Sequence, residues 1–356
     1  MKSIFALLAI VLLQLNIYGQ DAYTISGIVK NAKGEPIESA TIFLAGSEKV
    51  MPTNVLGRFI FQNVSPGTYQ VVVNMLGYTS FKQNVILKTR SEILDFTLKE
   101  KQILINEVII GDKDAQAKHL KTFLKYFMGQ SANAKACKIL NPEIIEFSTS
   151  NGFLKATTED FLIIENNNLG YKVKYLLNNF QFNKVQHITY YGGNCILEQM
   201  QGTPTREAVW DKNRKLAYEG SLMHYLRSLY AGTSRKEGFL VYDLWSDEIP
   251  IRISVAPIVA EDIVRRPDST MMVFNNGQTK YYIVYDKKKA AREDKPDNRT
   301  KQLDVLDDTG SMFRTDAQID SRGSYSDNKL LSIEGYWGSK RIGDQLPFEY
   351  DPSHTP

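Results

Sequence analysis

The sequence has few of the residues from which metal centres and reactive sites are usually built. Among its 356 residues there are two cysteines and four histidines. No Cys-x-x-Cys, His-Glu-x-x-His or His-x-x-Glu spacing occurs, so the sequence does not indicate a zinc peptidase. A Gly-x-Ser-x-Gly nucleophile elbow and a glycine-rich phosphate loop that opens a helix are absent as well. We therefore expect no cofactor and no metal, and the sequence favours a protein that is not an enzyme.

An excess of charge of one sign is also lacking. Lys and Arg together number 43 and Asp and Glu 40, which gives a net charge of +3. Nucleic-acid-binding domains usually carry a pronounced basic surface, so no nucleic-acid partner is expected.

Long apolar runs are missing beyond the N-terminus. Ile4–Leu13 is an uninterrupted apolar run that follows Lys2. It is shorter than the about 20 residues that cross a bilayer, and its layout is typical of a cleaved signal peptide, predicted here over residues 1–20. The alternative is a buried first helix or strand. The signal peptide predicts an exported protein, periplasmic or associated with the outer membrane, with no transmembrane segment in the mature chain.

The two cysteines, Cys137 and Cys195, leave two alternatives open. Export would place them where a disulfide can persist, and an even number permits one. They could equally be two small buried apolar residues.

Residues 21–100 are predicted to form an antiparallel β-sandwich. Short β-rich runs alternate with turns that contain glycine and proline, as in two packed sheets of short strands. The runs are Tyr23–Lys30, Ala40–Ala45, Arg58–Gln62, Tyr69–Met75, Phe81–Leu87 and Ile93–Leu98. Gly57 and Gly67 stand where tight turns are expected to require positive φ.

This segment also contains a series of short phrases: Ile25-Ser26-Gly27-Ile28-Val29, Gly34-Glu35-Pro36-Ile37, Ala40-Thr41-Ile42, Gly57-Arg58-Phe59, Pro66-Gly67-Thr68-Tyr69 and Gly77-Tyr78. In order and spacing the series resembles the carboxypeptidase regulatory-like domain, a transthyretin-like sandwich. The resemblance implies a module found beside carboxypeptidases and at the N-termini of TonB-dependent receptors of polysaccharide-using Gram-negative bacteria. Related sandwiches often bind glycans. The resemblance implies no catalysis, because in carboxypeptidases the peptidase is a separate domain.

Residues 101–113 are predicted to be a linker strand. Leu104–Ile110 is similar to the short strand that precedes the plug in those receptors. The rest of the chain lacks the many alternating strands of about ten residues that a receptor barrel needs, so a transporter is not expected. Residues 114–356 are instead predicted to be an uncharacterised α+β domain with an antiparallel sheet and two or more helices. The predicted fold class is therefore mainly β.

Two helices and a hairpin are predicted within this second domain. A helix is expected over Asp114–Met128, because four apolar residues fall on one helical face: Leu120, Phe123, Leu124 and Phe127. A second helix is expected over about Trp210–Tyr230. The sequence Asn275-Asn276-Gly277-Gln278 predicts a hairpin between Met271–Phe274 and Lys280–Tyr285.

The second predicted helix carries the side chains that come nearest to a reactive site. Ser221 and His224 are three residues apart and could touch on a helix, with Arg227 one turn further on. An orienting carboxylate would have to come from elsewhere in the fold. Ser221 and His224 also belong to a narrow stripe of small and polar residues, which could be either a close-packing face or the wall of a site. Ser221, His224 and Arg227 are therefore catalytic candidates without a complete motif.

Paired carboxylates for glycoside cleavage are a further alternative. Such pairs are recognised only by their spacing of about 5–9.5 Å in the fold. The candidates are Glu159, Asp160, Asp316 and Asp320, which can equally be acids of the surface or of turns.

Several phrases of the second domain resemble a group of exported two-domain proteins from the same kind of bacteria: Asn141-Pro142, Leu169-Gly170-Tyr171, Ala217-Tyr218-Glu219-Gly220-Ser221, His224-Tyr225-Leu226-Arg227 and Gly335-Tyr336-Trp337-Gly338. This resemblance implies an architecture and no chemistry. The sequence as a whole predicts a non-catalytic envelope protein that binds or scaffolds an envelope protein or a glycan through its sandwich. The alternative is an unrecognised hydrolase in the second domain, with the sandwich as an accessory module.

Overall fold

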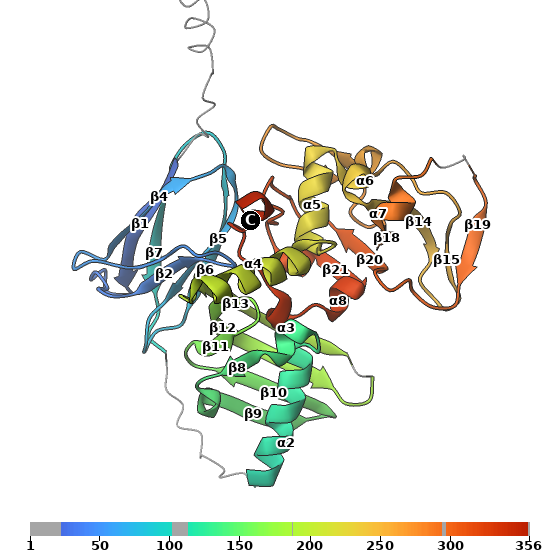
Figure 1. The fold of residues 1–356 in the computed structure, drawn as a ribbon. Coiled ribbons are helices and arrows are strands. Elements are labelled where there is room, and N and C mark those ends of the chain that lie inside the picture. Colours follow the sequence, from blue (N-terminus) through green and yellow to red (C-terminus); the bar gives the residue numbers. More distant parts are fainter. Residues whose placement is uncertain (1–22, 102–112, 187, 294–296, 355–356) are drawn as a thin grey trace, which may run out of the picture.

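The computed structural model describes residues 23–101, 113–186, 188–293 and 297–354. The predicted signal peptide and most of the predicted linker strand lie outside these residues. Three β-structured parts surround the C-terminal segment: the sandwich, a sheet from residues 137–199 and a sheet from residues 239–335 (Figure 1). In the described part of the chain, no helix combines the length and the apolar character needed to cross a membrane.

Residues 23–101 form a sandwich of two sheets, with strand orders β4-β1-β7 and β3-β2-β5-β6. Every second residue of the strands points into a core that includes Ile25, Val29, Phe59 and Phe96, as a half-buried strand requires. One pair departs from the antiparallel prediction, because β1 runs parallel to β7. The strands are β1 Tyr23–Asn31, β2 Thr41–Leu44, β3 Val50–Pro52, β4 Arg58–Val64, β5 Gly67–Asn74, β6 Phe81–Leu87 and β7 Glu92–Leu98.

The second part is a six-stranded antiparallel sheet organised around one long strand, β12. Strands β11 and β10 pair with the two halves of one edge of β12, and β13 pairs with its other edge. Helical segments α2, η1 and α3 precede the sheet, and their buried residues share its core. The elements are α2 Lys113–Phe123, η1 Leu124–Met128, α3 Ala132–Lys135, β8 Cys137–Ile139, η2 Pro142–Ile144, β9 Ile145–Ser150, β10 Phe153–Thr158, β11 Leu162–Asn166, β12 Tyr171–Asn183 and β13 Thr189–Gln199.

The first predicted helix is present, but its last turn is a π-helix, η1. Phe123 and Phe127 are fully buried as predicted, whereas Leu124 is 37% exposed. The prediction that Leu124 shares their apolar face was wrong. Leu124 and Phe127 both lie on η1, and a π-turn holds more residues than an α-turn, so they do not keep the α-helical spacing that the prediction assumed.

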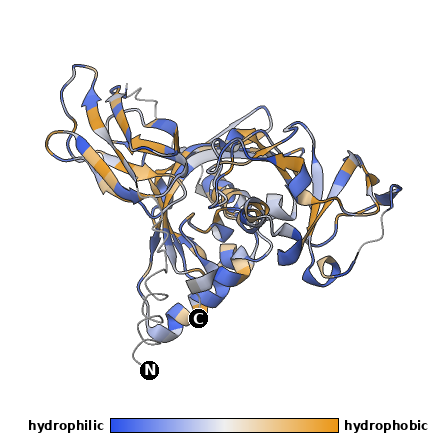
Figure 2. Ribbon diagram, turned by 90° about the horizontal axis from the view of Figure 1, so that it is seen from above, coloured by the Kyte–Doolittle hydropathy of each residue, from blue (hydrophilic) through white to orange (hydrophobic). Residues whose placement is uncertain are grey.

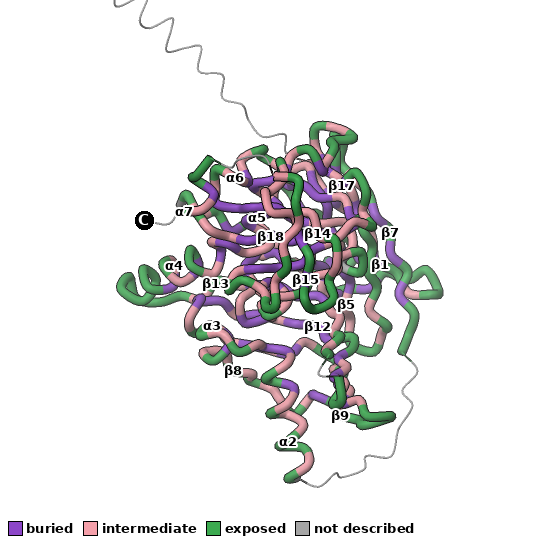
Figure 3. Tube along the Cα trace, turned by 90° about the vertical axis from the view of Figure 1, so that its right-hand side faces the viewer, coloured by how far each residue is buried: buried purple, intermediate pink, exposed green. Residues whose placement is uncertain are grey.

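The third part is a six-stranded sheet of order β19-β15-β14-β18-β20-β21, preceded by helices α4 to α6. Two apolar clusters, one of which includes α5, enclose this sheet. Buried residues are concentrated in β14 and β18 (Figure 3). Seen from above, the sandwich and this third sheet lie at opposite ends of the molecule (Figure 2). The elements are α4 Pro204–Tyr218, α5 Leu222–Ala231, α6 Ser234–Glu237, β14 Phe239–Ser246, β15 Ile251–Ser254, η3 Ala260–Ile263, β16 Val264–Arg265, β17 Val273–Phe274, β18 Tyr281–Tyr285, α7 Lys287–Ala290, β19 Thr300–Leu303, β20 Ser311–Thr315, η4 Asn328–Leu330, β21 Leu331–Gly335, α8 Tyr336–Ser339, η5 Ile342–Asp344 and η6 Pro352–His354.

The second predicted helix is in fact two helices. Gly220 adopts a φ of 73°, which ends the path of α4, and Ser221 then caps the N-terminus of α5. A glycine in this conformation followed by a serine cap is the usual way to stop one helix and start another. The single helix predicted over Trp210–Tyr230 was therefore wrong at this point.

The predicted hairpin around Gly277 was also wrong. Strand β17 pairs with β16, whereas β18 pairs with β14 and β20. The Asn275–Thr279 segment is a turn, but it joins strands of different sheets because long-range packing overrides the local signal.

Candidate functional site

Ser221 and His224 lie together, but not as a nucleophile and its base. Ser221 Oγ accepts a hydrogen bond from the backbone N–H of His224 at 3.1 Å, the geometry of a helix cap. His224 Nδ1 accepts from the backbone N–H of Gly220 at 3.0 Å, so the ring proton sits on Nε2, which donates to Glu237 at 2.8 Å. Both ring nitrogens are thus occupied, and neither faces the Ser221 hydroxyl as a general base would.

The environment of His224 favours the neutral imidazole. Burial lowers the pKa of His224, and the hydrogen bond and charge of Glu237 oppose this effect. His224 is 5% exposed, and its ring packs against Tyr218 and Phe239. His224 therefore ties α5 to Gly220 and to α6.

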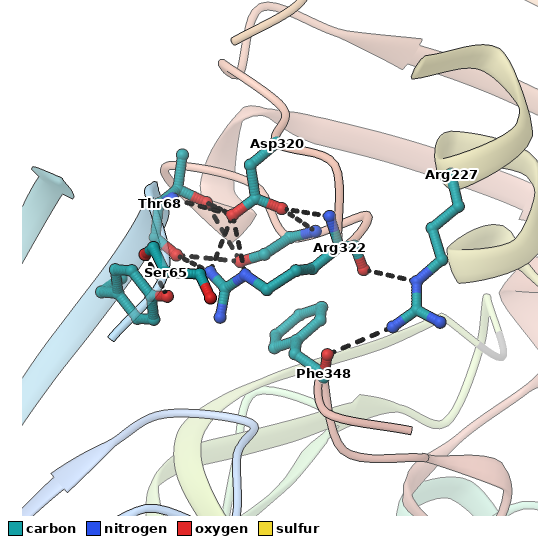
Figure 4. Close-up of polar contacts among 8 residues, drawn as sticks. Ser65, Thr68, Arg227, Asp320, Arg322 and Phe348 are labelled. Carbon is teal, nitrogen blue, oxygen red and sulfur yellow. Dashed lines mark hydrogen bonds and ion pairs between the residues drawn. The ribbon is translucent and has the colours of Figure 1, made fainter. Parts of the chain in front are cut away.

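Arg227 binds main-chain oxygens and has no contact with Ser221 or His224 among the hydrogen bonds of the described residues. Its guanidinium donates to the carbonyl oxygens of Arg322 at 2.8 Å, Tyr350 at 2.7 Å and Phe348 at 3.1 Å. The residue thus fastens the C-terminal segment and the Arg322 loop to α5 (Figure 4).

An open pocket of about 350 Å³ lies beside His224. Its wall contains the hydrogen-bonded pair His224–Glu237 and the ion pair Lys287–Glu219, with N–O distances of 2.8 and 3.2 Å. The remaining lining residues are Lys215, Tyr218, Lys236 and Pro352. Nothing in this geometry provides an activated nucleophile.

Three of the four candidate carboxylates are exposed, and each makes a single polar contact among the described residues. Glu159 pairs with Lys101, Asp160 accepts from the N–H of Phe161, and Asp316 accepts from the side chain of Gln278. The fourth candidate, Asp320, is fully buried.

The disulfide that Cys137 and Cys195 could have formed is not present, and both are free thiols. Cys137 lies on β8 and Cys195 on β13, and strands β11 and β12 separate them in the sheet. Two intervening strands at about 4.8 Å per spacing exceed the Cα separation of about 7 Å that a disulfide tolerates. Burial raises the pKa of each thiol to about 12.

Asp320 is the centre of a polar network that joins the sandwich to residues 113–354, referred to below as the body. Its Oδ2 accepts from the backbone N–H of Thr68 at 2.8 Å and from Arg322 Nη2 at 2.7 Å. Its Oδ1 accepts from the backbone N–H groups of Arg322 and Ser324 at 2.8 and 3.1 Å. Thr68, Asp320, Arg322 and Ser324, the interdomain network, come from β5 of the sandwich and from the loop after β20 (Figure 4).

Arg322 extends the interdomain network onto the sandwich. Its Nη2 donates to the carbonyl of Thr68 at 2.7 Å, and its guanidinium lies 4.0 Å from the centre of the Tyr69 ring. The Tyr69 hydroxyl donates to the carbonyl of Ser65 at 2.7 Å. Burial raises the pKa of Tyr69 to about 12, although the Arg322 charge opposes the rise. A guanidinium that meets a carboxylate, a carbonyl and a ring face has a fixed position.

Gly67 makes the approach of Asp320 possible. A Cβ at this position would lie 2.5 Å from Asp320 Oδ2. The sequence predicted a glycine with positive φ here, and its φ is 159°; the close approach of the body's carboxylate also leaves no room for a side chain.

An apolar contact lies beside the network. Phe43 and Val72 are cross-strand partners on the outer face of the four-stranded sheet, and both are buried against Ile196 of β13. Main-chain hydrogen bonds also join β13 to the sandwich, since the Gly46 N–H donates to the Cys195 carbonyl at 2.8 Å. The sandwich and the body are thus joined by apolar, polar and main-chain contacts together.

The other outer face of the sandwich is exposed. Ser26 of β1 lies between Ile60 of β4 and Ile93 of β7 in the register of the three-stranded sheet. Ile60 and Ile93 are 45% and 77% exposed. This row, the Ile60–Ile93 face, is exposed where the Phe43–Val72 pair is buried.

Comparison with known proteins identifies the sandwich. Residues 25–110 match the CarboxypepD_reg-like domain. No curated protein matches the chain. The sandwich is therefore a CarboxypepD_reg-like domain, and the match ends before the body.

Solved structures resemble the chain only distantly. A DUF3823 family protein from Bacteroides ovatus is 9% identical, with 51% of this chain and 83% of that chain covered at a TM-score of 0.19. The 3-chlorocatechol 1,2-dioxygenase from Rhodococcus opacus is 11% identical, with 24% and 62% covered at 0.21. The Bacillus anthracis TIE protein is 16% identical, with 22% and 16% covered at 0.20. The chain thus spans less than two thirds of the latter two proteins, and TM-scores this low do not establish a shared fold.

Proposed function

We propose that this protein is a non-catalytic scaffold of the cell envelope, in which the sandwich holds a partner protein in a fixed position relative to the body. The observation that carries the proposal is the interdomain network with its buried Asp320. A sandwich fixed at one face by apolar, polar and main-chain contacts cannot turn independently of the body. The N-terminal apolar run supports a place in the envelope, because it predicts export.

The Ile60–Ile93 face is the proposed contact for the partner. The two outer faces of the sandwich carry comparable apolar pairs, and the body covers one of them. Burial of one isoleucine side chain contributes about 1.5–3 kcal/mol. Because Ile60 and Ile93 are 45% and 77% exposed, a partner that covered both would gain about 2–4 kcal/mol, which is roughly 100-fold in affinity.

The experiment compares three tagged full chains in affinity capture from cross-linked native envelopes. Ile60→Glu combined with Ile93→Glu places charge on the proposed contact. Leu76→Glu is the matched control, because Leu76 is 80% exposed in the turn between β5 and β6 of the same sandwich. Circular dichroism establishes that all three chains fold alike.

A protein captured by the unchanged chain and by Leu76→Glu, but lost with the double variant, would support the proposal. Its purified form should then bind the double variant roughly 100-fold more weakly. Equal capture by all three chains would overturn the assignment of this face. Substrate turnover by the intact chain that disappears on substitution of His224 or Glu237 would favour the hydrolase alternative instead.

A further inference from the structure

A second pocket differs in charge from the one beside His224. Its lining residues include basic side chains but no acidic ones. It measures about 410 Å³ and is formed by η1, the loop after it, the start of β13 and the segment after α8. The residues of this pocket, the η1 pocket, are Lys125, Tyr126, Gly129, Gln130, Ser131, Thr189, Ser339, Lys340 and Arg341.

The three cations of the η1 pocket are not neutralised by carboxylates among the described residues. The contacts they make are with aromatic rings: Lys125 with Tyr126 at 5.0 Å, Lys340 with Tyr336 at 4.6 Å and Arg341 with Tyr191 at 5.5 Å. Three like charges around one concavity repel one another, and an anion between them would relieve this repulsion.

Arg341 is held in place before any ligand arrives. Its stem packs on Gly129, where a Cβ would lie 3.2 Å from the Arg341 Cβ. Gly129 also has a φ of 101°, which disfavours any other residue there. The planar guanidinium on the Tyr191 ring is therefore preorganised for the paired oxygens of an oxyanion.

The hydroxyl of Thr189 adds an uncharged hydrogen-bonding group to the lining of the η1 pocket. The Thr189 Oγ1 is buried and has no hydrogen-bond partner among the described residues. A buried hydroxyl of this kind is costly to leave unpaired. A ligand oxygen in the pocket would give it a partner.

The wall and the size of the η1 pocket suit more than a bare inorganic ion. Tyr126 stacks on Phe182 with ring centres 3.9 Å apart, so an aromatic ring is fixed at the wall. A volume of about 410 Å³ has room for roughly a dozen water-sized groups. Lys125 and Tyr126 both lie on the π-helix, a distortion that is frequent at functional sites.

We propose that the η1 pocket binds a small molecule that carries a phosphate or sulfate ester, with the ester between Lys125, Lys340 and Arg341 and the organic part against Tyr126. The inference does not depend on the Ile60–Ile93 face or on a partner protein.

The test is calorimetric titration of the full mature chain with glucose 6-phosphate, inorganic phosphate and glucose at low salt. Glucose 6-phosphate should bind saturably and more weakly as salt is added, and glucose should not bind. Lys340→Gln combined with Arg341→Gln should weaken the binding by about tenfold or more, since two charged hydrogen bonds are lost. Lys236→Gln, which removes the same charge from the other pocket, should leave it unchanged.

Lys125→Gln serves as a second variant, because Lys125 is exposed and its loss does not disturb the core. It should also weaken the binding if the double variant fails to fold. Equal affinities for inorganic phosphate and glucose 6-phosphate would support an oxyanion site with no sugar contact, and a higher affinity for the ester would support the contact with Tyr126. Absence of saturable binding by any of the anions, or unchanged binding in the folded variants, would overturn the proposal.

Discussion

Asp320→Asn should uncouple the sandwich from the body. The Asp320 side chain is fully buried, and Arg322, 18% exposed, lies 2.7 Å from it. Asn is of the same size but has no charge, and its amide group can replace only one carboxylate oxygen as an acceptor. Either the Thr68 N–H or the loop N–H groups then face another donor, and the Arg322 cation loses its partner. Breaking a buried ion pair in this way costs about 3–5 kcal/mol.

The distribution of tryptophan allows this loss to be assigned to the interface. The three tryptophans, Trp210, Trp245 and Trp337, all lie in the body. Tryptophan fluorescence therefore reports on the unfolding of the body, whereas far-ultraviolet circular dichroism reports on the sandwich as well. In urea the two signals should coincide for the unchanged chain and separate for Asp320→Asn, because the sandwich has its own core and can unfold apart from the body.

Asp316→Asn is the control for this prediction. Asp316 lies in the same loop, but it is exposed and contacts Gln278. Its replacement should change the free energy of unfolding by no more than about 0.5 kcal/mol. Coincident signals and an unchanged midpoint in Asp320→Asn would refute the reasoning, since the network would then contribute nothing to the coupling.

Three further predictions concern the close approach at Gly67, the burial of the two cysteines and the titration of His224. Gly67→Ala should weaken the interface by about 1–3 kcal/mol through overpacking, because a Cβ would lie 2.5 Å from Asp320 Oδ2; an unchanged urea midpoint would contradict this close approach. Cys137 and Cys195 should resist iodoacetamide at pH 8 until the protein is denatured, because burial raises the pKa of each thiol to about 12; rapid labelling of the native protein, counted by mass spectrometry, would disprove the burial. Burial also lowers the pKa of His224 below its ordinary value of 6.5, against the opposing effect of its carboxylate neighbour. As pH falls below 6.5 the unfolded chain therefore takes up this proton first, so the free energy of unfolding declines; His224→Gln should flatten the decline between pH 7.5 and 5.5, and an identical decline would exclude His224 as its source.

The sandwich could be predicted because its signals are local. Alternation and turn residues fix a strand from its immediate neighbours, and the predicted Phe81–Leu87 is β6 with the same bounds. The missed strand β3 has three residues and little burial, so it carries no such pattern. The parallel pairing of β1 with β7 joins residues at the two ends of the domain, and periodicity does not report on pairing. The boundaries of the domains stay predictions.

The body was harder to predict, for two different reasons. At Gly220 and Ser221 a local signal was present, a stop glycine followed by a cap, but the helical spacing on either side of it suggested one continuous helix. At Asp320 there was no local signal, because its partner Thr68 lies 252 residues away. An acid in a polar loop has the same sequence pattern whether it faces solvent or another domain. Only the fold separates Asp320 from Asp316.

The apolar and polar parts of the interface have different consequences for the proposed scaffold. The contact of Phe43 and Val72 with Ile196 removes apolar surface from water, but such a contact is non-directional and tolerates rotation. A buried carboxylate does not tolerate rotation. Each oxygen of Asp320 must accept hydrogen bonds from its donors, because the cost of removing the carboxylate from water is otherwise not compensated. Together with the directional main-chain bond from Gly46 to Cys195, the network thus selects one orientation of the sandwich among those that the apolar contact permits. The orientation of the Ile60–Ile93 face follows from it, so a partner bound there would be held at one position relative to the body.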